Sequence, residues 1–495
     1  MEKILPIGII SFRGQEKIFG IKPNDRLRHI YIVGKTGQGK TTLLENMINF
    51  DIQKMNGFAF LDPHGDSVQR VLDYIPKERI DDVIYFNPAD INHPIGFNPL
   101  ENVSWEYRHL AAISLLSIFK KIWVDAWSAR MEYILTNVLL ALLEWPQATL
   151  LDVNRMLADD KFRKLIVNNL RDEVVKAFWL KEFDKYHLQF RTEAVAPIQN
   201  KIGQFITNPL IRNIIGQEKS SFDLRKIMDE GKIFLANLSV GAIGEETSRL
   251  LGGLLITKFQ LAAMSRVDIP EEERKDFCLY IDEFQNFSTE SFINILSGAR
   301  KYHLSLVLAH QYLDQISEEI IKSVMGNIGT LIVFRVGSKD AEVLSREFGY
   351  MIGMEDLINL PSYYIYIKLL VDGKPVGPFL AKTMVPPKKQ EISFKDEIIN
   401  LNHLRYARRR SFLEAKIAKI YSQVRQEGNL VNCSQCRQLF LSHGDEICEE
   451  CLERAKTGFS FKKAIETGII VEKKRNIIQS PKNLDEILKK LINES

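Results

Sequence analysis

Eight residues near the start of the chain have the types and spacing of a loop that binds phosphate groups. They fit the pattern G-x-x-x-x-G-K-[ST], in which backbone N–H groups surround the phosphates of a nucleotide. The stretch reads Gly34, Lys35, Thr36, Gly37, Gln38, Gly39, Lys40 and Thr41. An apolar run typical of a strand precedes it and a segment of helical spacing follows, so bound phosphates would lie at a helix N-terminus. A chance match in a glycine-rich turn is the alternative, and the flanking strand and helix argue against it.

The loop predicts a nucleoside triphosphate as ligand. Lys40 would reach the β- and γ-phosphates, and the hydroxyl of Thr41 would hold Mg²⁺. Thr42, the next residue, completes the expected nucleotide-binding stretch.

Two carboxylates follow a second apolar run, where a hydrolytic site would need them. Asp282 and Glu283 come directly after residues 277–281. Either carboxylate alone would more often belong to a surface turn, but paired acids after an apolar strand, in a chain with a phosphate loop, favour catalysis. We expect Asp282 to assist Mg²⁺ binding and Glu283 to polarise the attacking water.

Further candidates lie beside other predicted strands. Gln311 follows the apolar run 304–308 and is expected at the γ-phosphate or its water, although a local turn contact explains it equally well. Phosphoryl transfer also uses an arginine, often from a neighbouring subunit, and Arg300, Arg335 and Arg346 are candidates. Most arginines are simply solvated surface residues.

Strands alternate with helices in two parts of the chain, which predicts an α/β fold with a mainly parallel sheet. Between about 101 and 217 the strand signal disappears, and a helical pattern indicates an inserted all-α domain. The expected strands lie at 8–12, 17–21, 30–33, 57–62, 82–86, 232–237, 277–281, 304–308 and 329–334, with a final hairpin at 363–371 and 376–383. The expected helices lie at 42–50, 131–144, 150–169, 172–186, 246–265, 288–301, 316–325 and 339–348.

The composition limits the class of protein. The 495 residues include 66 Lys+Arg and 63 Asp+Glu, a net charge of +3, so any nucleic-acid surface must be local. No run approaches the roughly 20 apolar residues of a membrane span, so we expect no transmembrane segment. Five cysteines, four of them in C-x-x-C pairs, suit a reducing compartment, and we expect a cytoplasmic protein.

Together these segments resemble the HerA/FtsK superfamily of P-loop motors, and most closely the TraG/TraD-like coupling proteins of type IV secretion and conjugative DNA transfer. The resemblance covers about 25–385. It is carried by residues 34–41, 61–66, 280–287, 299–302, 309–311, 326–330 and 334–337. The block Asp282-Glu283-Phe284-Gln285-Asn286 and the block Ala309-His310-Gln311 are far more specific than the phosphate loop.

The resemblance implies a RecA-like P-loop domain that hydrolyses ATP, forms a ring, usually a hexamer, and moves DNA. By position Arg300 would be the arginine offered across the subunit interface, with Arg335 as second choice. Asp62 and His64 would face the nucleotide from an adjacent strand. Membrane-anchored coupling proteins carry transmembrane helices before the motor, and we expect this chain to lack them.

A cysteine pattern predicts a small metal module near the C-terminus. The spacing C-x2-C-x11-C-x2-C joins Cys433, Cys436, Cys448 and Cys451, which suits tetrahedral Zn²⁺. A redox pair or chance is the alternative. The preceding segment 388–425 carries ten Lys/Arg against four Asp/Glu on an expected helix. It is either a solvated helix face or a contact for DNA or a protein partner.

The expected domains are a discontinuous P-loop domain, an insertion and three C-terminal parts. Their bounds are 1–100 with 221–385 for the P-loop domain, 101–220 for the all-α insertion, 386–430 for a basic helical linker, 431–456 for the zinc module and 457–495 for a Lys-rich tail.

We therefore predict an Mg²⁺-dependent ATPase that assembles as a ring and moves DNA, which is expected to be double-stranded. Two alternatives stay open: a nucleotide-gated adaptor whose zinc tail recruits a protein, and a secretion or pilus-type ATPase that handles protein.

Overall fold

The computed structural model describes residues 4–422, 429–432, 434 and 439–442. The chain forms two compact units, Met1–Ala418 and Lys419–Ser495. In the second unit the described residues form a two-stranded antiparallel sheet of β12 (Asn429–Asn432) and β13 (Leu439–Ser442). The four cysteines predicted to bind zinc, and the tail 457–495, lie outside the described residues.

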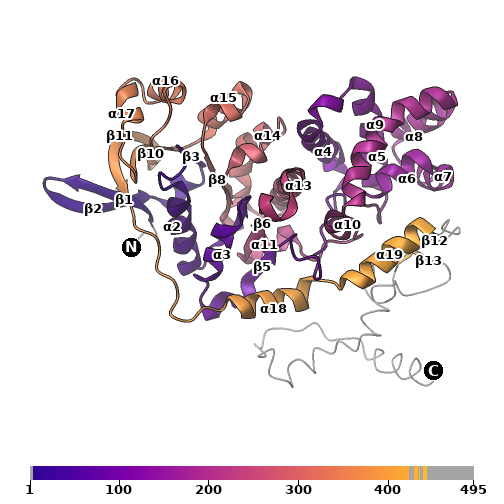
Figure 1. Cartoon of the computed structure of the whole chain (residues 1–495), viewed down its shortest axis with the longest axis horizontal. Coiled ribbons are helices and arrows are strands. Elements are labelled where there is room, and N and C mark those ends of the chain that lie inside the picture. Colours follow the sequence, from indigo (N-terminus) through magenta and orange to yellow (C-terminus); the bar gives the residue numbers. More distant parts are fainter. Residues whose placement is uncertain (1–3, 423–428, 433, 435–438, 443–495) are drawn as a thin grey trace, which may run out of the picture. The chain divides into compact units, whose positions relative to one another are not determined.

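The first unit is built on one mixed sheet, in which eleven strands of the described chain run in the order β2-β1-β11-β10-β9-β3-β8-β7-β4-β6-β5 (Figure 1). Strands β9 to β5 of this order are parallel, and β2, β1, β11 and β10 add an antiparallel extension. The strands are β1 (Leu5–Phe12), β2 (Gln15–Ile21), β3 (Ile30–Val33), β4 (Gly57–Asp62), β5 (Val83–Phe86), β6 (Ile233–Asn237), β7 (Phe277–Ile281), β8 (Leu304–His310), β9 (Thr330–Val333), β10 (Tyr364–Val371) and β11 (Lys374–Thr383).

The parallel strands are buried along their whole length, which explains their continuous apolar sequences. Every residue of β3, β4, β6, β7, β8 and β9 is buried. Parallel strands covered on both faces are expected to be apolar throughout rather than alternating. The predicted α/β fold is confirmed, and the sheet is mixed, with parallel strands from β9 to β5 and an antiparallel extension.

Helices connect these strands and cover the sheet (Figure 1). They are α1 (Pro23–Arg26), α2 (Lys40–Gln53), α3 (Asp66–Leu72), α11 (Leu224–Glu230), α12 (Val240–Ile243), α13 (Glu245–Met264), α14 (Phe292–Gly298), α15 (Glu318–Asn327), α16 (Ser338–Glu347) and α17 (Met354–Ile358). The predicted helix over 288–301 is shorter than expected, since α14 ends at Gly298 and a 3₁₀ turn, η9 (Ala299–Tyr302), continues it.

Between β5 and β6 the described chain contains helices and no strands. They are α4 (Arg108–Ile122), α5 (Ala129–Glu144), α6 (Asp152–Ala158), α7 (Asp160–Asn168), α8 (Glu173–Ala177), α9 (Leu188–Thr207) and α10 (Pro209–Ile215). The single helix predicted over 150–169 is divided at Asp159, whose carboxylate accepts the backbone N–H groups of Lys161 and Phe162 and so begins a new helix.

The basic segment predicted as one helix is two helices, α18 (Lys395–Tyr406) and α19 (Arg410–Ser422). An isolated β-bridge between Ile95 and Ala407 separates them. The side chain of Asn402 on α18 is buried against β5, where its Oδ1 accepts the N–H of Tyr85 at 2.7 Å and its Nδ2 donates to the carbonyl of Val83 at 3.0 Å.

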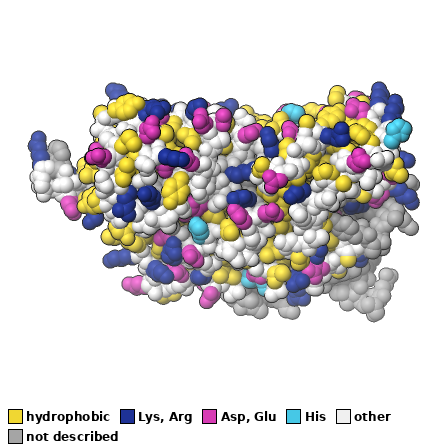
Figure 2. Space-filling view, turned by 45° about the horizontal axis from the view of Figure 1, so that its top comes forward, with side chains coloured by type: hydrophobic (Ala, Val, Ile, Leu, Met, Phe, Trp, Pro, Cys, Tyr) yellow, Lys and Arg dark blue, Asp and Glu magenta, His cyan; other side chains and the backbone are white. Residues whose placement is uncertain are grey.

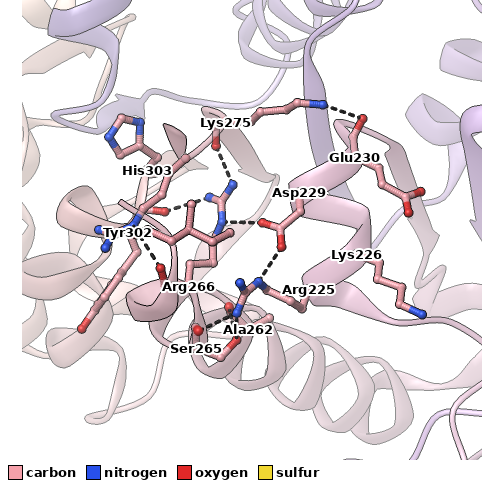
Figure 3. Close-up of polar contacts among 12 residues, drawn as sticks. Arg225, Lys226, Asp229, Glu230, Ala262, Ser265, Arg266, Lys275, Tyr302 and His303 are labelled. Atoms are coloured by element: carbon pink, nitrogen blue, oxygen red, sulfur yellow. Dashed lines mark hydrogen bonds and ion pairs between the residues drawn. The ribbon is translucent and has the colours of Figure 1, made fainter. Parts of the chain in front are cut away.

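A buried arginine joins the segments that precede strands β6, β7 and β8 (Figure 3). Arg266, which is 0% exposed, donates to the carboxylate of Asp229 and to the carbonyls of Tyr302 and Lys275, each at 2.8 Å. Because a buried charge is stable only when it is paired and hydrogen-bonded, this set fixes α11, η9 and the residues before β7 relative to one another.

One segment of the described chain, Glu245–Asp268, is long and apolar enough to cross a membrane. Of its most apolar window, 72% is buried inside the fold. Helices in the core of a folded domain pass the same test, and α13 is such a helix.

Candidate functional site

The phosphate loop joins β3 to α2 and depends on glycines at two kinds of position. Gly37 and Gly39 have φ of 75° and 112°, a region that disfavours residues with a Cβ. Gly34 needs space instead, because a Cβ there would lie 2.5 Å from Cβ of Phe334. The loop is also held from outside, since the N–H of Lys35 donates to the carbonyl of Arg335 at 2.9 Å.

Lys40 is folded back onto the loop that it belongs to. Its ammonium group is buried, and it donates to the carbonyl of Gly34 at 2.7 Å and to that of Lys35 at 3.2 Å. Burial lowers the pKa of Lys40, although the carboxylates of Glu283 and Asp282 favour its charged form. The lysine therefore lies where an incoming phosphate would replace the two carbonyls.

The predicted acids lie next to this loop. Strands β4, β7, β8 and β3 end level with one another, as the pairs Leu61–Ile281 and Val33–His310 show, so their carboxyl-end loops meet. Asp282 is 2% exposed, and Thr41 Oγ1 lies 3.4 Å from its Oδ2. Burial, together with the charges of Glu283 and Asp62, raises the pKa of Asp282 to about 7.

The carboxylate of Glu283 is held on both oxygens. Gln311 Nε2 donates to Oε1 and Gln285 Nε2 donates to Oε2, each at 2.6 Å, and His64 Nε2 lies 3.7 Å from Oε1. Burial opposes ionisation of Glu283, but the hydrogen bonds from Gln285 and Gln311 and the nearby imidazole of His64 outweigh it and lower its pKa to about 2. Glu283 has φ of 47°, a backbone strain found often at functional sites.

Gln311 also contacts the phosphate loop. Thr36 Oγ1 donates to Gln311 Oε1 at 2.8 Å, so one amide links the loop to Glu283. The structure brings Gln311 beside Glu283 and the phosphate loop, and its expected contact with the γ-phosphate or its water stays a prediction.

Asp62 and His64 have different surroundings. Asp62 is fully buried, with Oδ1 accepting the N–H of His64 and Oδ2 accepting those of Ser67 and Val68. Its carboxylate therefore begins α3 and shapes the loop. The side chain of His64 is 61% exposed, and its contact with the carboxylate of Glu283 is the main cause of its raised pKa.

The comparison with protein families decides what kind of chain carries this site. Residues 17–405 match the family described as type IV secretion-system coupling protein DNA-binding domain. The chain belongs to this family. The resemblance expected from the sequence motifs is thereby confirmed, and no curated protein sequence matches the chain.

Solved structures agree with the fold of the coupling-protein family. The bacterial conjugative coupling protein TrwBdeltaN70 in its unbound monoclinic form is 15% identical, with a TM-score of 0.55, and the match covers 77% of this chain and 90% of that one. TrwB in complex with ADP and Mg²⁺ is 14% identical, with a TM-score of 0.55 and 78% and 95% covered. VirB4 of Thermoanaerobacter pseudethanolicus is 11% identical, with a TM-score of 0.52 and 78% and 96% covered. At these identities the likeness shows the RecA-type NTPase fold of the coupling-protein chain.

Two of the three candidate arginines, Arg335 and Arg300, lie at opposite edges of the sheet, and the third, Arg346, lies in the last turn of α16. Arg335 follows β9, and its carbonyl contacts the phosphate loop of the same chain. Arg300 is exposed on η9, before the amino end of β8, whereas Gln311 follows the carboxyl end of that strand. Arg300 therefore lies away from the loop of its own chain.

Two contributors to the site carried no signal in the sequence. Gln285 lies inside the motif that follows β7, but nothing assigned it to Glu283. Lys121, at the end of α4, donates to the carbonyls of Gln285 and Ser288 at 2.6 and 2.5 Å. Burial lowers the pKa of Lys121 to about 7, with a further lowering from Arg249. A lysine near a helix end is ordinary in any sequence, so only its position in the fold reveals the contact.

Apart from Asp282 beside the phosphate loop, one cluster of side chains in the described part of the chain has residue types that commonly bind metal ions. Asp90, His93 and His403 place their nitrogen and oxygen atoms within 4.8 Å of one another. The two imidazole rings stack at 4.0 Å with an angle of 16°. Stacked, parallel rings direct their nitrogen lone pairs side by side rather than at one point. We therefore interpret the group as polar contacts of both histidines with Asp90, which join the loop after β5 to α18.

Charges on the visible surface are mixed. On the face in Figure 2, Lys and Arg side chains are intermingled with Asp and Glu side chains, in keeping with the net charge of +3. This face therefore has no broad positive field.

Proposed function

We propose that the chain is a Mg²⁺-dependent ATPase that hydrolyses ATP to move double-stranded DNA in the cytoplasm. The observation that carries the proposal is the meeting of Lys40, Thr41, Asp282, Glu283 and Gln311 at one edge of the sheet, in a chain of the coupling-protein family. TrwB has been crystallised with ADP and Mg²⁺ and with a non-hydrolysable ATP analogue, which supports the same ligands here.

In this proposal the phosphates bind the N–H groups of residues 34–42, and Lys40 exchanges its two loop carbonyls for phosphate oxygens. Glu283 then accepts a hydrogen bond from the attacking water. Each carboxylate oxygen has two lone pairs, so Glu283 can accept the water while Gln285 and Gln311 stay bound. Gln311 would link this carboxylate to the phosphate loop, since Thr36 contacts its other end.

The donors beside the phosphate loop fit a Mg²⁺ ion. Thr41 offers a hydroxyl and Asp282 a buried carboxylate, both of them oxygen ligands that a hard cation prefers. The bound ion would neutralise charge on the phosphates. Asp282 would contribute as a carboxylate, the form that burial disfavours and that a bound cation would favour.

The proposal includes a ring, expected to be a hexamer, in which Arg300 of one subunit serves the site of the next. Its exposure and its distance along β8 from Gln311 support a role in trans. Arg335, which contacts the phosphate loop through its backbone, is the second candidate. A trans arginine makes hydrolysis in one subunit depend on its neighbour.

The remaining parts of the proposal concern domains and the tail. We propose a P-loop domain of 1–100 and 221–385, an all-α insertion of 101–220, a basic segment of 386–430, a Cys₄ zinc module of 431–456 and a Lys-rich tail of 457–495. The four-thiolate spacing supports Zn²⁺, and the module is proposed to recruit a protein partner.

The test is steady-state ATP hydrolysis by the full chain with and without double-stranded DNA, at low and high salt. The proposal expects DNA to raise the rate and salt to suppress the increase, because phosphate contacts release counterions. Glu283→Gln is the matched control, since it keeps the shape of the side chain but cannot accept a proton. Hydrolysis that ignores DNA would contradict DNA movement and favour a motor that handles protein.

A second candidate, left open by the sequence, is a nucleotide-gated adaptor in which ATP sets assembly and the tail recruits a protein. Binding of ATP with no turnover at any DNA concentration would support the adaptor and contradict the motor.

A further inference from the structure

Tyr363, directly before β10, has an unusual backbone. Its φ is 69°, and its side chain is half exposed. A left-handed φ is an outlier for a bulky aromatic residue and persists only where surrounding contacts impose it. Residues with such backbone strain cluster at ligand sites.

The backbone of Tyr363 is held from two sides. Its N–H donates to the carbonyl of Gln38 in the phosphate loop at 3.1 Å. Its carbonyl accepts the N–H of Thr383 at 2.8 Å and the hydroxyl of Thr383 at 3.0 Å. The strained residue is therefore fixed between the phosphate loop and the end of β11.

The ring of Tyr363 lies against the last glycine of the loop. A Cβ on Gly39 would be 3.0 Å from its Cδ1 and 3.6 Å from its Cε1. The residue before it takes part too, because Ser362 Oγ donates to Oε1 of the buried Gln38 at 3.3 Å. Loop and ring thus form one unit, with half of the tyrosine left uncovered.

The segment that follows β11 is fastened to α2. Asn46 Nδ2 donates to the carbonyl of Val385 at 3.0 Å and to that of Met384 at 3.5 Å. The end of β11 that holds Tyr363 is thereby also fixed to the helix that begins at the phosphate loop.

We propose that the ring of Tyr363 is the platform on which the purine base of the bound nucleotide stacks. This inference rests on the proposed nucleotide site. Phosphates held by the loop and the start of α2 leave the nucleoside to extend over the adjoining surface, and there the half-exposed ring of Tyr363 stands on a fixed backbone. Stacking on an aromatic ring needs no hydrogen bond to the base edge, so the site takes ATP and GTP alike and discriminates against triphosphates without a base.

The experiment compares ATP with inorganic tripolyphosphate, each titrated calorimetrically into the full chain with Mg²⁺. Tyr363→Leu keeps an apolar side chain but removes the π face, and Tyr363→Phe keeps the face. We expect Tyr363→Leu to lower the affinity for ATP about 10- to 100-fold, the range typical of a lost base–aromatic stack. Tripolyphosphate should bind within about twofold of wild type, and Tyr363→Phe should bind ATP within about threefold.

The matched control is Tyr350→Leu. Tyr350 is also exposed and also has a left-handed φ, of 59°, but it follows α16. The Tyr350→Leu variant should bind ATP and tripolyphosphate with the affinities of wild type.

Three results would overturn the platform. Equal weakening of ATP and tripolyphosphate by Tyr363→Leu would mean that the ring only shapes the loop. Unchanged ATP affinity, or GTP bound about a hundredfold differently from ATP by wild type, would also contradict it. A failure of the proposed function itself looks different, because wild-type protein would then bind neither ATP nor tripolyphosphate.

Discussion

Asp282 should make the protein less stable when it is ionised, and replacing it with asparagine should show by how much. Its pKa is raised from 3.8 to about 7 by burial and by the charges of Glu283 and Asp62. Such a change corresponds to about 4 kcal/mol, because each tenfold step in an equilibrium constant is about 1.4 kcal/mol. Between pH 3.8 and about 7 the folded state binds more protons than the unfolded state, so stability falls as the pH rises through this window.

Asparagine has the same shape and no charge. It keeps an oxygen for the N–H of Glu283, which Asp282 Oδ1 accepts at 3.0 Å, and its amide can donate to Thr41. We therefore expect Asp282→Asn to stabilise the nucleotide-free protein at pH 8 by up to about 4 kcal/mol, and the gain to shrink towards zero near pH 4. Urea unfolding of both proteins at pH 5, 6, 7 and 8 measures the difference.

Comparing the two proteins at each pH removes the contribution of every other titrating group. A gain that is equal at all four pH values, or a variant that is less stable at pH 8, would refute the assignment of a raised pKa to Asp282. Thr41→Val is a useful second variant, because it removes the neighbouring hydroxyl and leaves the carboxylate in place.

Three further predictions address contacts outside the carboxylate. Mixing Arg300→Ala with Lys40→Ala protein should restore part of the ATPase activity that each lacks, as shared interfaces would then combine one intact arginine with one intact loop; no recovery in confirmed mixed rings would count against a trans role. Lys121→Met should leave ATP affinity unchanged and lower kcat about tenfold, since the loop after Glu283 loses its anchor; an equal change in KM would contradict this. Arg266→Ala should cost about 3–5 kcal/mol in urea unfolding, because the carbonyls of Tyr302 and Lys275 lose their donor and Asp229 keeps only Arg225; a loss below 1 kcal/mol would show that these bonds contribute little.

The sheet could be predicted from the sequence because its physics is local. Strands buried on both faces have continuous apolar runs, and β3, β4 and β7 were found from such runs alone. The phosphate loop and the acids Asp282 and Glu283 could be placed together, because the carboxyl ends of parallel strands lie at the same edge of the sheet. The divided helix at Asp159 was missed because an aspartate in a helical pattern has no distinctive spacing until its capping contacts are seen.

The finer arrangement of the site depended on contacts between residues far apart in the chain. Gln285 and Gln311 both donate to Glu283. Only Gln311 directly follows an apolar strand, so only Gln311 could be selected as a site residue from its place in the sequence. Asp62 was expected to face the nucleotide, whereas its neighbours Ser67 and Val68 use its oxygens. Spacing predicts which residues share an edge and does not predict how each carboxylate is already occupied.

Asn402 has a consequence for how the protein can be shortened. Strand β5 ends the row of strands, and an outer strand offers free N–H and carbonyl groups to any other extended chain. The carboxamide of Asn402 occupies one of each on β5. It therefore acts as a cap against strand addition, supplied by a helix that lies beyond the last strand of the sheet. Versions of the protein that stop at Thr383 would keep the eleven strands of this sheet but expose the outer edge of β5, which favours aggregation. Versions that continue through Tyr406 would keep that edge covered.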